Sequence, residues 1–158
     1  MPVAQGDLSL LSSEVAKELL GSTIPARLAY SWEDGTPRVV PIWFHWTGEE
    51  LVFGSPHNAP KLKALREGAQ AAVTIDTEGE PTRVLMIRGP ISVEIQDGVV
   101  PEYEASARRY LGDVAGLEWV ENIKQQGAKM ARISLRPTWV AVLDFEKRFP
   151  SALGGVIG

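Results

Sequence analysis

The sequence has no cysteine and only two histidines among its 158 residues. The absence of cysteine excludes disulfides, thiolate metal sites and a cysteine nucleophile. His45 and His57 form no HExxH-type spacing, and a zinc site would need carboxylates to complete it. We therefore expect no metal site. A chain without cysteine also agrees with a reducing compartment, and we expect a cytoplasmic protein.

Long apolar runs and an excess of basic charge are also missing. No apolar run approaches about 18 residues, the length of a membrane span. Residues 1–11 lack the basic stretch and apolar core of a signal peptide. Lys and Arg number 16 against 20 Asp and Glu, which gives a net charge of −4, whereas nucleic-acid binders are more often basic. We expect no membrane span and no nucleic-acid partner.

Several enzyme motifs are absent as well. The glycines form neither a dinucleotide-binding fingerprint nor a phosphate-binding loop. Ser55 precedes a proline and does not stand in the Gly-x-Ser-x-Gly turn of serine hydrolases. His45 falls within an expected strand, so His57 is the histidine that is free to act as a base. His57 is either a plain loop residue or a functional one.

The residues that are present predict a mainly β protein with peripheral helices. The length suits one domain, residues 1–158, with a core of residues 22–146 between an N-terminal helical segment, 1–21, and a C-terminal tail, 147–158. Helices fall between hairpins and do not alternate with strands, which favours a small antiparallel barrel. Six or seven strands are expected, within 26–32, 38–46, 51–55, 71–76, 82–95, 131–135 and 138–146. Helices are expected at 8–20, 101–111 and 117–126, with a short basic helix near Lys61.

Three details refine this pattern. Asp34-Gly35 supplies the left-handed position of a hairpin turn. Pro41 lacks a backbone donor and indicates an edge strand, or a strand whose backbone faces a ligand. Gly89-Pro90, in the middle of a long strand, indicates a bend at a barrel corner.

The stretch from Gly54 to Gly68 contains three basic residues, which could bind a negatively charged group. Asn58 is a candidate N-cap, Pro60 suits the first turn, and Lys61 stands at the start of the expected helix, where an anion is favoured. Ser55 adds a hydroxyl donor at the end of the preceding strand. Lys61 is either a phosphate ligand or part of a solvated surface.

Other basic and aromatic residues have two interpretations too. Lys63 and Arg66 either form the solvated face of the short helix or meet further negative charge. Arg38 and Arg88 stand on strands from which they could approach the same anion. The aromatic cluster at 43–46 indicates that at least one of its tryptophans, Trp43 or Trp46, lines a ligand pocket or a subunit interface.

The run "DGTPRVVPIWFHWTGEELVFGSPHNAPKLKALREGAQAAVTID" resembles the pyridoxamine 5'-phosphate oxidase-like superfamily of flavin- and deazaflavin-dependent proteins. "RVLMIRGPISVE" and "MARISLRPTWVAVLDF" look like the later strands of that family, so the resemblance covers about residues 22–146. The resemblance implies an antiparallel split β-barrel of the FMN-binding type. It also implies a homodimer with two cofactor sites at the interface, each built from both chains.

The resemblance also assigns site residues. Lys61 matches the phosphate-binding lysine, Ser55 the Ser or Thr at the strand end, and Arg38 the arginine of FMN-binding members. The expected cofactor-binding residues are Arg38, Val39, Val40, Pro41, Ile42, Trp43, Ser55, Lys61, Lys63, Arg66 and Arg88. Arg88 is implied as a phosphate or cross-dimer contact.

The implied cofactor is FMN or the F-420 type deazaflavin coenzyme. FMN oxidases usually place a serine two residues before the lysine, where this chain has Ala59, and the Pro-x-Trp-Phe strand is more common in the deazaflavin branch. Lys63 and Arg66 would then face the anionic tail of the deazaflavin. We expect a reductase that transfers a hydride between the ring and a small organic substrate, without a catalytic side chain. The alternative is a non-enzymatic protein that binds or stores flavin, deazaflavin or haem. Trp43 or the tail around Phe149 is expected to wall the open face of the ring.

Overall fold

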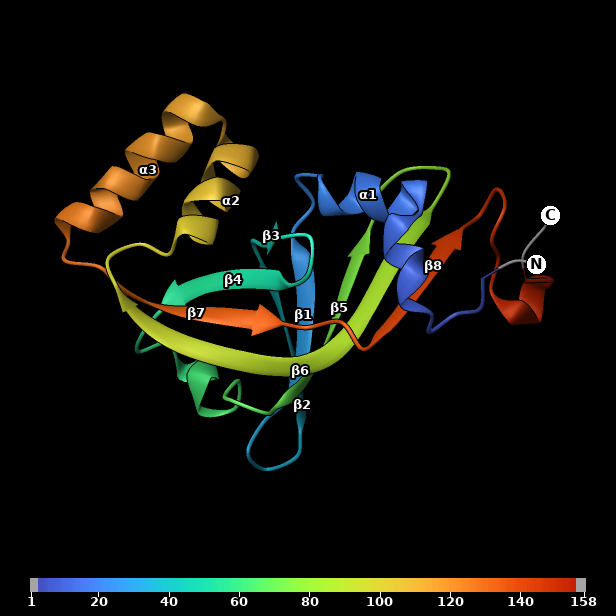
Figure 1. The fold of residues 1–158 in the computed structure, drawn as a ribbon, viewed down its shortest axis with the longest axis horizontal. Helices are drawn as coiled ribbons and strands as arrows, with labels where there is room; N and C mark the ends of the chain where they lie inside the picture. The colour runs from blue at the N-terminus through green and yellow to red at the C-terminus, as the bar shows by residue number, and fades with distance from the viewer. Residues whose placement is uncertain (1–2, 156–158) are drawn as a thin grey trace.

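Eight strands in one antiparallel sheet form the body of the protein (Figure 1). The computed structural model describes residues 3–155. The strands are β1 (Ala26–Ser31), β2 (Pro37–Ile42), β3 (His45–Trp46), β4 (Leu51–Pro56), β5 (Gln70–Asp76), β6 (Arg83–Asp97), β7 (Lys129–Leu135) and β8 (Trp139–Asp144). The helices are α1 (Glu14–Leu20), α2 (Pro101–Leu111) and α3 (Asp113–Gln125), with short 3-10 turns η1 (Leu8–Ser12), η2 (Pro60–Lys63) and η3 (Ser151–Leu153). No helix in residues 3–155 is long and apolar enough to cross a membrane.

The long strand β6 joins the two halves of the sheet. The strands lie in the order β2-β1-β5-β6-β7-β4-β3, and β8 also pairs with β6. Residues 84–90 of β6 pair with β5, whereas residues 91–97 pair with β7. The change of partner falls directly after Gly89-Pro90, and Figure 1 shows β6 as a long curved strand that passes below β4 and β7. The expected barrel corner is confirmed, and a Cβ at Gly89 would collide with the carbonyl group of Arg136.

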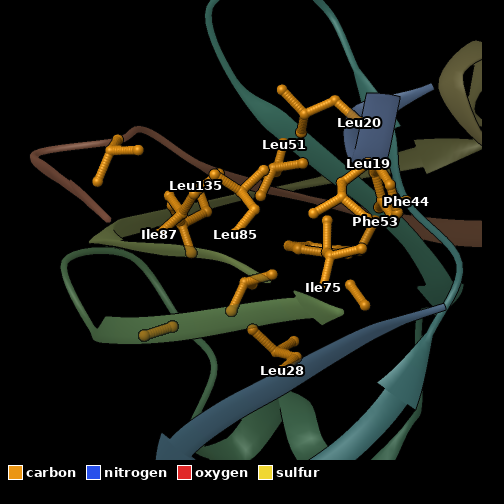
Figure 2. Packing of buried hydrophobic residues seen from close by; sticks show 14 of the residues in the cluster. Leu19, Leu20, Leu28, Phe44, Leu51, Phe53, Ile75, Leu85, Ile87 and Leu135 are labelled. Carbon is orange, nitrogen blue, oxygen red and sulfur yellow. The ribbon is translucent and has the colours of Figure 1, made fainter. Parts of the chain in front are cut away.

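The core fills the space that the curved sheet encloses. Leu85 and Ile87 of β6, Ile75 of β5 and Phe53 of β4 are fully buried. Figure 2 shows the leucines of α1 pointing among these strand residues, so α1 closes the sheet on one side. The burial of these side chains supplies most of the driving force for this arrangement, at about 1.5–3 kcal/mol for each large apolar side chain.

The predicted strand 38–46 is two strands in the structure. β2 pairs with β1, whereas β3 pairs with β4. The chain passes from one half of the sheet to the other at Trp43 and Phe44. The side chain of Phe44 is fully buried in the core at this point. Trp43 and His45 therefore do not lie on one continuous strand. β2 is the last strand of its half of the sheet, which confirms the edge position indicated by Pro41.

Two predicted helices also differ. Residues 8–20 do not form one helix, because Ser13 ends η1 and its hydroxyl caps α1 by accepting from the Ala16 N–H at 3.2 Å. The basic helix at Lys61 is only the four-residue η2. Its N-cap is Ala59, which has no side-chain oxygen, so the predicted capping by Asn58 is wrong. A single 3-10 turn presents too few aligned backbone N–H groups to bind an anion in the way a helix N-terminus does.

Candidate functional site

A groove with aromatic walls lies between β4 and the helices α2 and α3. It consists of two adjoining hollows, of about 410 and 640 Å³, that share Gly54, Tyr103 and Trp119. Three of the predicted site residues, Pro41, Ile42 and Trp43, line the first hollow. We call the two hollows together the aromatic groove. They fall within the size range of small-molecule sites.

The groove exists because α2 packs closely on β4. A Cβ at Gly54 would lie 2.6 Å from Cδ2 of Tyr103, so a bare backbone is required beneath that ring. The Trp119 Nε1–H donates to the Tyr103 hydroxyl at 2.9 Å, which ties α3 to α2. The ring of Trp43 lies 6.0 Å from that of Tyr103, and together these aromatic groups wall the groove. Aromatic rings are typical walls for planar ligands.

Trp43 is held in place by two residues of α2. Its ring stacks on that of Tyr110, with 5.1 Å between the centroids and 7° between the planes. The Arg109 guanidinium donates to the carbonyl of Phe44, and through Nε to the carbonyl of Ser22 at 2.8 Å. These bonds fix the segment between β2 and β3, and with it the wall of the groove.

The predicted phosphate ligands Ser55 and Lys61 lie at the end of β4 and just beyond it. Ser55 is buried, and its Oγ has no hydrogen-bond partner among residues 3–155. It alternates with Gly54 along β4, so its side chain points to the core and not into the aromatic groove. Lys61 is half-buried and forms no ion pair within that range; burial lowers the pKa of its ammonium group. Both groups are polar, poorly solvated and unpaired.

The loop between them borders the groove. His57 and Asn58 line its second hollow, and His57 Nδ1 lies 3.2 Å from the Lys129 carbonyl oxygen. Lys63 and Arg66 are exposed and have no ion-pair partner in the described part of the chain. Three basic residues, Lys61, Lys63 and Arg66, thus follow the groove-lining loop in the sequence, and none of them has an ion pair among residues 3–155.

Arg38 and Arg88 meet elsewhere. They line a separate hollow of about 370 Å³, whose other lining residues belong to β1, β2 and β5. Arg38 donates to Thr36 Oγ1 at 2.5 Å, and the Arg88 guanidinium lies 3.8 Å above the ring of Trp139. Neither arginine has a carboxylate partner among residues 3–155. Within one chain, these two arginines therefore line a different hollow from Pro41–Trp43.

The remaining predicted site residues divide along β2. Val40 is half-buried and packs against the core, whereas Val39 points outward and is 65% exposed. Phe149 packs edge-on against Phe145 and lines a hollow beside β8, not the aromatic groove. Within one chain, Trp43 therefore walls the groove and the tail around Phe149 does not.

Solved structures share this architecture. No family model and no curated protein matches the chain. A protein described as an F420 reductase is 24% identical, with a TM-score of 0.56 over 78% of this chain and 93% of its own. The haem storage protein HutZ from Vibrio cholerae is 16% identical, with a TM-score of 0.59 over 80% of this chain and 90% of its own.

A third match decides which fold this is. A putative pyridoxamine 5'-phosphate oxidase from Listeria innocua is 18% identical, with a TM-score of 0.51 over 82% of this chain and 91% of its own. The chain has the pyridoxamine 5'-phosphate oxidase-like split-barrel fold. The expected fold class is confirmed, and at these identities the likeness shows the fold alone.

The split barrel also carries a polar cluster that the sequence did not reveal. Arg132 of β7 donates through Nε and Nη2 to Glu102 Oε1 of α2, at 3.0 and 2.8 Å. Burial would raise the pKa of Glu102, but these hydrogen bonds outweigh it and hold the pKa below its usual value. His45 lies within the field of Glu102 and Arg109, and burial lowers its pKa. These residues come from elements that are far apart in the sequence, so no local sequence pattern predicts the cluster.

Tyr103 and Trp119 were also missed as site residues. Each stands in a segment correctly predicted as helical, and each is an aromatic residue among charged neighbours. Such a residue is as readily a core anchor as a pocket wall. Only the packing of α2 and α3 on β4 shows that both face the aromatic groove.

Proposed function

We propose that this protein is a flavin- or deazaflavin-dependent oxidoreductase that transfers a hydride to a small organic substrate. The observation that carries the proposal is the aromatic groove, which is bordered by Pro41–Trp43 and by the 56–58 loop. Lys61, which has no ion pair among residues 3–155, follows that loop in the sequence. A planar ring suits the aromatic walls, and an anionic tail suits the lysine. The likeness in fold to an F420 reductase supports this proposal.

The residues present fit a cofactor of this class. Lys61 is a half-buried charge without a counterion among residues 3–155. Leaving such a group unsatisfied costs free energy, which a phosphate on the cofactor would recover. The edge of β2 away from β1 has no strand partner in the same range, so its backbone groups are free to bind polar atoms of a ring.

When bound, a flavin or deazaflavin would supply the hydride chemistry. Pro41–Trp43 would hold the ring, Lys61 its first phosphate, and Lys63 and Arg66 any further negative charge. Ser55, predicted as a second phosphate ligand, points to the core and would not reach that phosphate. The aromatic walls Trp43, Tyr103 and Trp119 would orient a planar substrate and exclude water. The chain needs no side chain that acts as an obligate acid or base, so its contribution is binding and orientation.

We also propose a homodimer whose interface completes each cofactor site. On the outer face of the sheet, the strand registers place Val39, Ala29, Ala72 and Arg88 in one row. Val39 is 65% exposed, and its small apolar neighbours leave a flat surface beside it. A second copy docked here would bury that surface, and Arg38 and Arg88 would then face an anion held by the partner.

Cofactor titration tests the proposal. Purified protein is titrated with FMN and, separately, with the F-420 type deazaflavin, and binding is followed by quenching of cofactor fluorescence. We expect saturable binding of one of the two with one site per chain. Turnover is then measured with the reduced cofactor and a set of small unsaturated acceptors. Failure to bind either cofactor would overturn the proposal. Tight binding without turnover would show that the protein carries the cofactor and is not an oxidoreductase.

A haem-binding role is the second candidate. His57 lines the aromatic groove and is exposed, and the contact of its Nδ1 with the Lys129 carbonyl leaves Nε2 free to act as a ligand. The fold is shared with a haem storage protein. Titration with haem, followed by the Soret band of the wild type and of His57→Ala, distinguishes this role. A ligand role for His57 requires that the substitution alter the band.

A further inference from the structure

Another hollow lies between α1, β3 and α2. Its volume is about 680 Å³, and none of its lining residues belongs to the aromatic groove. Its walls combine basic side chains with leucines and a tryptophan. We call it the α1–α2 hollow. Nothing in the proposed oxidoreductase chemistry uses it.

The basic side chains come from three separate elements. Lys17 belongs to α1, His45 to β3 and Arg109 to α2. The Arg109 guanidinium donates only to carbonyl groups, those of Ser22 and Phe44, and these do not neutralise its charge. Within residues 3–155, neither Arg109 nor Lys17 has a carboxylate within ion-pair distance. The hollow therefore carries uncompensated positive charge in a protein whose net charge is −4.

The carboxylate that influences His45 does not cancel this charge. Glu102 is already engaged by two hydrogen bonds from Arg132, at 3.0 and 2.8 Å. Arg132 has a further contact with Glu50, at 3.8 Å. The group of Glu102, Glu50 and Arg132 carries one net negative charge, which offsets part but not all of the positive charge of Arg109 and Lys17. The His45 ring adds hydrogen-bonding capacity to the wall.

The hollow is also lined by apolar side chains. Leu8 is 45% exposed, Leu11 and Trp46 are half-buried, and Leu20 is buried at the base. Leu8 and Leu11 stand three residues apart on η1, whose three-residue period places them on one side. Accessible leucines and cations line the same hollow, so a ligand that fits it would have both an apolar body and a negative group.

We propose that the α1–α2 hollow binds an organic carboxylate that carries an apolar body. The carboxylate would accept from the unpaired side of Arg109 and from Lys17, and the apolar body would lie on Leu8, Leu11 and Trp46. A carboxylate suits this set better than a free phosphate, because phosphate has no apolar part to use the leucines. This binding activity goes beyond the proposed oxidoreductase function and does not require it.

Calorimetric titration with straight-chain carboxylates tests the proposal. Hexanoate, octanoate and decanoate are titrated into the full-length protein at about pH 8, below their self-association concentrations. Each added methylene that reaches the apolar wall should tighten binding about fourfold. Octanamide, which keeps the chain but lacks the charge, should bind at least about tenfold more weakly than octanoate.

Two variants locate the site. Lys17→Gln and Leu8→Ser change exposed side chains, so both should fold. Lys17→Gln should weaken octanoate binding about two- to fivefold, and Leu8→Ser should weaken decanoate about threefold or more. Lys147→Gln, which removes an exposed lysine outside the hollow, is the matched control. Equal affinity for octanoate and octanamide, or equal effects of Lys17→Gln and Lys147→Gln, would overturn the proposal, as would no binding at all.

Discussion

Tyr103 lies directly over Gly54, at a distance that no residue with a Cβ could allow. We therefore expect Gly54→Ala to displace Tyr103 and with it the wall of the aromatic groove. The substitution should lower the free energy of unfolding by about 1–3 kcal/mol, the usual cost of overpacking. Urea unfolding followed by far-UV circular dichroism measures this change.

A double-mutant cycle separates this contact from a general effect of the added methyl group. Tyr103→Ala removes the ring that the new Cβ would meet, so Gly54→Ala should cost much less in the Tyr103→Ala background. If the cost of Gly54→Ala is the same in both backgrounds, the close contact between α2 and β4 does not set the requirement for glycine.

Much of the barrel could be predicted because its signals are local. Pro41 indicated the edge strand and Gly89-Pro90 the corner of β6, since each changes the backbone at its own position. The contact of Tyr103 with Gly54 and the pair formed by Arg132 and Glu102 could not be predicted in this way. Each of them joins an α2 residue to a strand far away in the sequence, so tertiary packing alone determines it.

The break at Trp43 and Phe44 shows the same limit within one segment. Residues 38–46 have the composition of a single strand, and β propensity favours one. Phe44 nevertheless interrupts the strand, because its side chain is buried in the core and its carbonyl accepts a hydrogen bond from Arg109. Among the predicted site residues, this break is what places Trp43 in the aromatic groove while Val39 remains on the outer face.

Lys61→Gln should raise stability and weaken cofactor binding together. Burial lowers the pKa of Lys61 from its usual value, so at neutral pH the folded protein holds a charge that is better solvated in the unfolded chain. Removing that charge should raise the melting temperature of the cofactor-free protein. The loss of a charge-assisted bond should weaken binding of the preferred cofactor about tenfold or more.

Lys147→Gln is again the matched control for Lys61, because Lys147 is exposed. It should change neither the melting temperature nor the affinity appreciably. Unchanged affinity of Lys61→Gln for both FMN and the deazaflavin would show that the phosphate lies elsewhere. The hollow lined by Arg38 and Arg88 would then be the next candidate.

Val39→Asp should convert the proposed homodimer into monomers. Val39 is 65% exposed on the outer face of β2, and a carboxylate there would have to be buried without a partner when a second copy docks. We expect the dimer dissociation constant to rise at least about a hundredfold, measured by sedimentation. Cofactor affinity should fall in parallel if both chains build each site.

Val114→Asp provides the comparison for that experiment. Val114 is 74% exposed on α3 and lies outside the row of Val39 and Ala29. It should leave the oligomeric state unchanged. Dissociation by Val114→Asp instead of Val39→Asp would move the interface to α3, and a monomeric wild type would contradict the proposed dimer.

His45 should make stability fall as the pH falls through the range in which histidine titrates. Burial, and after it the charge of Arg109, lowers the pKa of His45, against the opposing charge of Glu102. The unfolded chain therefore binds a proton at higher pH than the folded protein does. The stabilising contribution is fully present above the unfolded value of about 6.5 and declines as the pH drops below it.

Urea unfolding at a series of pH values from about 8 to 5 measures this dependence. His45→Gln should flatten the profile in that window, because it removes the group whose proton uptake differs between the two states. His57→Gln, which removes the exposed loop histidine, controls for the loss of a histidine as such. If the two variants give the same profile as each other, the half-buried position of His45 on β3 is not the source of the pH dependence, and the field of Arg109 does not act on it.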